Sequence, residues 1–106
     1  LSLDEMMKNL QFAGVNCASS VEFEKDLVAS VAMKLFDFYE YVVENAFDGL
    51  NYLLARFFYR DNCYYACIDA VCSLDLTTLQ TEDISVSVSD DNYYTISFKL
   101  EGGDGR

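Results

Sequence analysis

The chain has 106 residues, of which 52% are hydrophobic and 15% aromatic, and its formal net charge at pH 7 is −11. This length allows one domain with a single core, expected to span residues 1–106, and the apolar content excludes a disordered chain. The charge argues against unaided binding to nucleic acid or to an anionic membrane, because both are polyanions.

The chain contains no histidine, so it lacks the usual general base and the commonest metal ligand. It also has no phosphate-binding loop and no nucleophile constellation. We therefore expect a protein that is not an enzyme and needs no cofactor. No signal peptide is visible, and Arg56, Arg60 and Asp61 interrupt the best candidate for a membrane span, so we expect a cytoplasmic protein.

The first predicted helix begins at Ser2, which forms a capping-box pattern with Glu5, and it ends before Gly14. Apolar residues repeat at helical spacing between these signals, at Leu3, Met6, Met7 and Leu10.

A second capping box, Ser19 with Glu22, predicts a long amphipathic helix over residues 20–47, which Asp48 and Gly49 interrupt. At about 100° per residue, one side of this helix collects an acidic stripe within a sector of about 80°, formed by Glu22, Asp26, Asp37, Glu40, Glu44 and Asp48. The opposite side is apolar and carries Leu27, Val28, Val31, Leu35, Phe38, Tyr39, Val42 and Ala46.

Residues 50–72 are compatible with two structures. Read as helix, Leu53, Leu54 and Phe57 share a face, and Asp61 or Asn62 caps a second helix. Read as strand, residues 53–59 and 64–70 alternate around an Asp61-Asn62 turn. The helical pattern matches more positions, and we favour helix here.

The C-terminal part predicts a β-hairpin. Apolar and polar residues alternate over residues 84–89 and 94–100, on either side of a turn at residues 90–92. Residues 101–106 should form a flexible tail. The expected fold class is α+β: two to four helices, one of them long, packed on a C-terminal antiparallel hairpin or small sheet.

The four cysteines, Cys17, Cys63, Cys67 and Cys72, are interpreted as reduced, mostly buried thiols. Zinc binding is a weaker alternative, because the spacing contains no C-x-x-C pair. Glu82-Asp83 and Asp90-Asp91 resemble solvated turns more than catalytic or calcium-binding carboxylates.

Arg56 and Arg60 are the only arginines before the tail, and they lie four residues apart among aromatic residues. We expect them to pair with acids inside the molecule or to stack on tyrosine, rather than to bind phosphate.

The acidic stripe admits two interpretations. It could be an ordinary solvated helix face, or it could engage the lysines and arginines of a nucleic-acid-binding protein. Its six carboxylates give about one charge per 6.5 Å, whereas duplex DNA has one per about 1.7 Å. A nucleic-acid mimic would therefore need further acids on the same side, and the candidates are Glu82, Asp83, Asp90 and Asp91.

In composition the chain is similar to the small acidic inhibitors that phages use against host nucleases, including anti-restriction and anti-CRISPR proteins. This resemblance concerns surface character only. It implies a binding protein that blocks a basic surface on its partner. The alternative is a structural or regulatory module, such as an adaptor, an antitoxin or a chaperone-like subunit, that uses aromatic surface and homodimerisation, through either the hairpin edge or the uncovered side of the long helix.

Overall fold

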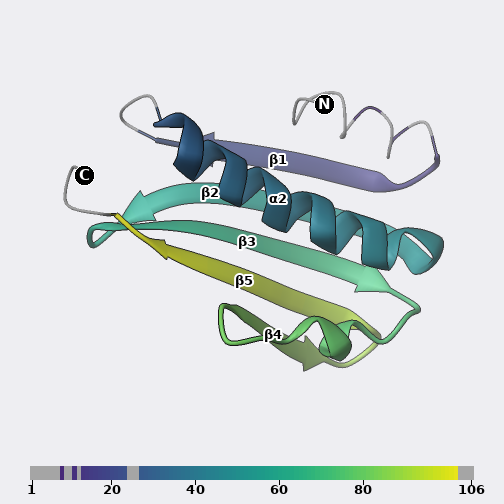
Figure 1. Cartoon of the computed structure of the whole chain (residues 1–106). Helices are drawn as coiled ribbons and strands as arrows, with labels where there is room; N and C mark the ends of the chain where they lie inside the picture. The colour runs from purple at the N-terminus through teal and green to yellow at the C-terminus, as the bar shows by residue number, and fades with distance from the viewer. Residues whose placement is uncertain (1–7, 9–10, 12, 24–26, 103–106) are drawn as a thin grey trace.

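The computed structural model describes residues 8, 11, 13–23 and 27–102. One α-helix, α2 (Ala29–Ala46), packs on a five-stranded mixed sheet with the strand order β1-β2-β3-β5-β4. In Figure 1 the helix lies along one face of this sheet. The fold is therefore α+β, with two layers.

Strand β1 (Asn16–Glu22) forms one edge of the sheet and pairs in parallel with β2 (Leu50–Arg60). Helix α2 and the 3₁₀ turn η1 (Phe47–Gly49) make the connection between these two parallel strands. Gly49 is required where this connection enters β2. A Cβ atom there would lie 2.5 Å from Ser73 Oγ and 2.8 Å from Leu74 Cγ, closer than real side chains approach.

Strands β2 and β3 (Cys63–Cys72) form an antiparallel hairpin around Asp61 and Asn62. Both turn residues have positive φ, 51° for Asp61 and 67° for Asn62. This is the type I′ geometry that matches the twist of a two-residue hairpin, and Asp and Asn tolerate it better than other residues with a side chain.

Strands β4 (Ile84–Ser89) and β5 (Tyr93–Glu101) form the second hairpin, and β5 pairs with β3. The sequence prediction of a hairpin in this region is confirmed. Before it, the 3₁₀ turn η2 (Leu76–Leu79) places Leu76 and Leu79 in the core. Glu101 is the last residue of β5, and of the predicted tail beyond it only Gly102 belongs to the described residues.

The core lies between α2 and the sheet. Phe38 stacks on Phe98 with ring centroids 5.3 Å apart, and Tyr39 packs against Phe57 at 6.2 Å. The predicted apolar side of the helix is confirmed for residues 35–46, since its buried residues are Leu35, Phe38, Tyr39, Val42, Val43 and Ala46.

The predicted helix over residues 20–47 is wrong in its first third. Residues 16–22 are a strand whose backbone pairs with β2, and the helix starts at Ala29, after Val28 in an extended conformation. The Ser19–Glu22 capping box is therefore not a helix start. Pairing with a long neighbouring strand outweighs this local signal. Val28, expected on the apolar side, is 60% exposed.

The helical interpretation of residues 50–72 is also wrong, and the alternative hairpin around Asp61-Asn62 is what forms. The described part of the chain contains one α-helix rather than two to four. The helix predicted from Ser2 lies almost wholly outside the described residues. No helix in the described part of the chain is both long enough and apolar enough to cross a membrane.

Candidate functional site

The outer face of α2 carries the part of the acidic stripe that the structure brings together. Asp37 and Glu44 are exposed, Glu40 is partly exposed, and Asp48 follows in η1. We call these four carboxylates the α2 acidic face, and the three on α2 itself lie within about 60° around the helix axis. All four extend over about 17 Å, or roughly one charge per 4 Å, which is denser than the stripe expected from the sequence.

The positions of two of these acids, Glu44 and Asp48, conflict with the helix dipole. The C-terminal end of a helix carries partial negative charge and favours basic residues. The last turn of α2 contains no basic residue, and Glu44 lies two residues before the helix ends. Asp48 adds a further negative charge just beyond the last residue of the helix. Glu44 and Asp48 thus occupy positions where negative charge destabilises the helix.

Large apolar side chains lie among the carboxylates. Met33 is 64% exposed, Tyr41 37% and Phe47 46%. At 100° per residue, Met33 and Tyr41 flank Asp37 on either side. Exposed methionine and aromatic residues within a charged surface are typical of protein-binding sites. These three residues were not predicted as partner-binding from the sequence.

Two members of the predicted stripe are not part of this face. Glu22 is on β1, where alternate side chains point to opposite faces of the sheet. Its neighbour Val21 points toward the helix side and contributes with Phe23 to an apolar hollow against α2, so Glu22 points to the other side. Asp26 lies outside the described residues.

The four further acids proposed as partner-binding divide between the two ends of β4. Asp90 and Asp91 are in the β4–β5 turn, and Asn92 next to them accepts a hydrogen bond from the Cys72 amide at 3.1 Å. Ser73 in turn bonds to the carbonyl of Gly49 at 2.9 Å, so this turn and Asp48 lie at the same end of the molecule. Glu82 and Asp83 precede β4 and lie toward its other end.

A further acid, Asp75, lies directly before η2 and was not predicted from the sequence. It caps η2, since its carboxylate accepts hydrogen bonds from Thr77 N at 3.0 Å and Thr77 Oγ1 at 2.6 Å. These bonds lower the pKa of Asp75 below its ordinary value. The Asp-x-Thr spacing is a recognisable capping signal.

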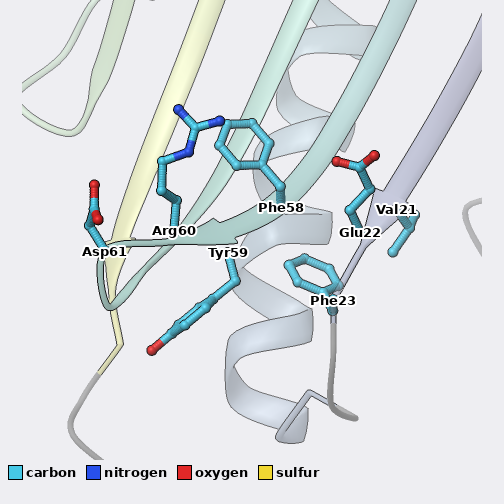
Figure 2. A pocket seen from close by; sticks show the side chains of 7 residues that line it. All are labelled: Val21, Glu22, Phe23, Phe58, Tyr59, Arg60 and Asp61. Atoms are coloured by element: carbon cyan, nitrogen blue, oxygen red, sulfur yellow. The ribbon is translucent and has the colours of Figure 1, made fainter.

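A hollow of about 570 Å³ lies where β1 and β2 end, next to the β2–β3 turn. Figure 2 shows Glu22, Phe58 and Arg60 on one side of the strands and Phe23 and Tyr59 on the other. The Arg60 guanidinium carbon lies 5.1 Å from the centre of the Phe58 ring. Both acids that line the hollow, Glu22 and Asp61, are exposed to solvent.

The sheet face opposite α2, which we call the open face, is not covered by any helix in the described part of the chain (Figure 1). Arg56 and Asp69 pair there at 3.3 Å, with side chains 45% and 13% exposed, and Thr95 donates to Asp69 at 3.0 Å. The prediction that Arg56 pairs with an internal acid is confirmed. Arg60 stacks on phenylalanine rather than on tyrosine.

Cys17, Cys63 and Cys72 are buried, while Cys67 is partly exposed on the open face. Burial raises the pKa of the Cys17 and Cys67 thiols. Among the residues that the structure describes, no three Cys, Asp or Glu side chains are grouped as metal ligands would be.

No protein-family model matches the sequence, and a search of curated proteins found no match.

Proposed function

We propose that this chain is a small acidic, non-enzymatic binding protein that blocks the basic surface of a nucleic-acid-binding partner through the α2 acidic face. The observation that supports it most is the combination of carboxylates with exposed Met33, Tyr41 and Phe47 on one helix face. Carboxylates alone would serve solubility equally well, whereas apolar side chains among them provide the buried contacts that stabilise a complex.

The position of two of the acids relative to the helix dipole also supports a binding role. Acids needed only for solubility could be placed anywhere on the surface. Glu44 and Asp48 instead occupy the end of α2 where negative charge is least favourable. Residues that break a local stability rule are commonly found at functional sites.

The charge density limits what the face can imitate. One charge per roughly 4 Å is about 40% of the density of duplex DNA. Asp90 and Asp91 lie at the same end as Asp48 and add to the acidic surface there. The α2 acidic face would thus compete for a few lysines and arginines on the partner and would steer association electrostatically, without reproducing a whole duplex.

The test begins with a pull-down from lysate of the native host at low salt, followed by elution in a salt gradient. Each recovered nucleic-acid-binding protein is then assayed for nucleic-acid binding with and without the added chain. We expect inhibition by the wild type. The variant Asp37→Lys/Glu44→Lys should bind about 10 to 100 times more weakly, because charge reversal replaces attraction with repulsion.

The matched control is Glu82→Lys/Asp83→Lys, which changes the net charge by the same amount at the start of β4. It should retain most of the inhibition. Equal losses of inhibition in the two variants would show that inhibition depends only on net charge, and would contradict a role for the α2 acidic face. A complex that resists high salt would contradict the electrostatic mechanism.

A second candidate is an interaction module of the adaptor, antitoxin or chaperone-like type, and the exposure of Tyr41 and Phe47 favours it. In that case apolar contacts dominate the affinity. Tyr41→Ala/Phe47→Ala would then weaken binding more than Asp37→Lys/Glu44→Lys does, and binding would depend little on salt.

A further inference from the structure

The two hairpins of the sheet differ in the residues they present on the open face. The β4–β5 hairpin presents mainly polar residues there, including Ser85, Ser87, Thr95 and Ser97. Strands β2 and β3 instead present a cluster of partly exposed, mostly apolar residues: Tyr52, Leu54, Phe58, Tyr65, Cys67 and Val71. We call these six residues the open-face cluster.

Strands that are apolar on both faces are typical of sheets covered on both sides, whereas strands with one solvated face alternate. The helix side of β2 and β3 is covered by α2, with Leu53, Ala55 and Ile68 fully buried. The open-face cluster therefore has the composition of a sheet face that packs against another surface when the protein functions.

The charges on the open face are balanced. Arg56, Arg60 and Lys99 are three of the seven basic residues of the chain. They share this face with three acids, Glu22, Asp69 and Glu101. The chain as a whole has a net charge of −11, so its excess negative charge lies elsewhere. A neutral, partly apolar face fits another neutral face better than it fits a polyanion or a strongly basic protein.

The size of the face is sufficient for a dimer. Strands β1, β2, β3 and β5 together contain 37 residues, which at about 3.3 Å per residue and about 4.8 Å between strands give a footprint of roughly 600 Å² on each copy. Two such faces would bury about 1,200 Å², at the lower limit of stable specific interfaces.

Stacking of nucleic-acid bases is a poorer fit. The Phe58 and Tyr65 rings stack on each other with centroids 5.1 Å apart and an interplanar angle of 16°. Arg60 lies over the Phe58 ring as well. One face of each ring is therefore already used within the chain, and Arg60 also covers Phe58, which leaves less aromatic surface to stack on bases.

We propose that the open face binds a second copy of this chain, so that two sheets pack face to face and the two α2 helices lie on the outside of the dimer. The two-sided apolar character of β2 and β3, the balanced charge and the area all fit this arrangement. The proposal is independent of the function proposed for the α2 acidic face.

The first test is sedimentation velocity of the full chain over a range of concentrations. We expect the wild type to sediment as a dimer, and Tyr65→Glu to sediment as a monomer with an unchanged far-UV circular dichroism spectrum. A charge buried against the neighbouring sheet is strongly unfavourable, but in the monomer it remains solvated. Tyr41→Glu, which adds the same charge on the outer face of α2, is the matched control and should remain dimeric.

The second test uses Cys67, which is the third of five open-face residues on the central strand β3. Facing sheets lie about 10 Å apart, so a short bis-maleimide can link the two Cys67 thiols while a direct disulfide cannot form. Cys67 is accessible to the reagent whenever the dimer dissociates, whereas the other cysteines are buried within each copy and should react slowly in monomer and dimer alike. We expect cross-linked dimers in the wild type and none in Cys67→Ser, which should still sediment as a dimer.

Several outcomes would overturn the proposal. A monomeric wild type at all concentrations does so, and so does a Tyr65→Glu variant that folds and remains dimeric. If Tyr65→Glu fails to fold, the cross-link decides, and its absence in a dimeric wild type places the interface elsewhere. A monomer that binds single-stranded oligonucleotides in a Tyr65-dependent manner would make the open face a nucleic-acid surface instead.

Discussion

At Glu44 the requirements of helix stability and of the proposed partner binding oppose each other. This residue lies in the last turn of α2, near the negative end of the helix dipole. We expect Glu44→Lys to raise the free energy of unfolding by about 0.5 to 1 kcal/mol, because the interaction with the dipole changes from unfavourable to favourable. Urea denaturation at low ionic strength would measure this gain.

The comparison variant for Glu44→Lys is Asp37→Lys, at the middle of the helix, where the dipole has little effect. It should change the stability less. A loss of stability in Glu44→Lys would show that Glu44 contributes to the fold, and its position would then no longer support a binding role.

Tyr39 makes the stability sensitive to alkaline pH. Its ring is fully buried, and burial, with a smaller effect of the Cys17 thiolate, raises its pKa well above the ordinary value near 10. The native state therefore holds the phenol proton more tightly than the unfolded chain does. This contribution is complete below about pH 10 and is lost, by at most about 1.4 kcal/mol per pH unit, as the pH rises toward the folded pKa.

We expect Tyr39→Phe to reduce this alkaline loss without abolishing it, because burial also raises the pKa of Cys17. Urea denaturation at about pH 9, 10 and 11, in the presence of a reducing agent, would measure it. Tyr41→Phe, which removes an exposed hydroxyl, is the control. An identical pH dependence in wild type and Tyr39→Phe would refute the role assigned to Tyr39.

The inner face of α2 could be predicted from sequence at the residue scale, because buried positions repeat with the helical period over residues 35–46. The pairing of Arg56 with an acid could also be predicted. Its partner Asp69 could not, because the two meet across the β2–β3 hairpin, a contact that depends on strand register.

At the scale of elements, β4 and β5 were predictable and β2 and β3 were not. Alternation identifies a strand when one of its faces is polar, as Ser85 and Ser87 are on β4. In β2 both faces carry apolar residues, for example Phe57 toward α2 and Phe58 on the open face. Adjacent apolar pairs at such positions match a helical period as well as a strand, so the pattern favoured helix.

The β2–β3 turn allows a direct test of the hairpin. Asn62 has a φ of 67°, and its side chain accepts a hydrogen bond from the Tyr59 hydroxyl at 2.7 Å. Asn62→Ala should lower the free energy of unfolding by about 1 to 2 kcal/mol, because alanine is disfavoured in the left-handed region and cannot accept this bond.

Asn62→Gly loses the same hydrogen bond but adopts positive φ freely, so it should remain within about 0.5 kcal/mol of wild type. Denaturant titration of both variants at one protein concentration would measure the difference. Equal losses in Asn62→Ala and Asn62→Gly would mean that the Tyr59 hydrogen bond, rather than backbone geometry, determines the stability of the turn.

At the scale of the whole molecule, the two faces of the fold differ in electrostatic character. The α2 side carries Asp37, Glu40 and Glu44, whereas acids and bases balance on the open face. A face-to-face dimer would present two α2 acidic faces in opposite directions. One dimer could then engage two partner molecules, or two sites on one assembly, and its avidity would exceed the affinity of either face.

This division of charge predicts opposite salt responses for the two proposed interactions. Binding of a basic partner should weaken as salt screens its attraction to the α2 acidic face. Dimer formation should instead strengthen, because each copy has a net charge of −11 and salt screens the repulsion between copies while the neutral open faces remain in contact.

Sedimentation of the wild type at about 0.05 M and about 0.5 M salt, compared with partner binding under the same conditions, would test this opposition, since the Debye length shortens about three-fold between them. Asp37→Lys/Glu44→Lys is the informative variant, because its lower net negative charge should make the dimer less sensitive to salt. A dimer that dissociates at high salt would instead be held together by ion pairs, which would contradict the apolar interface inferred for the open-face cluster.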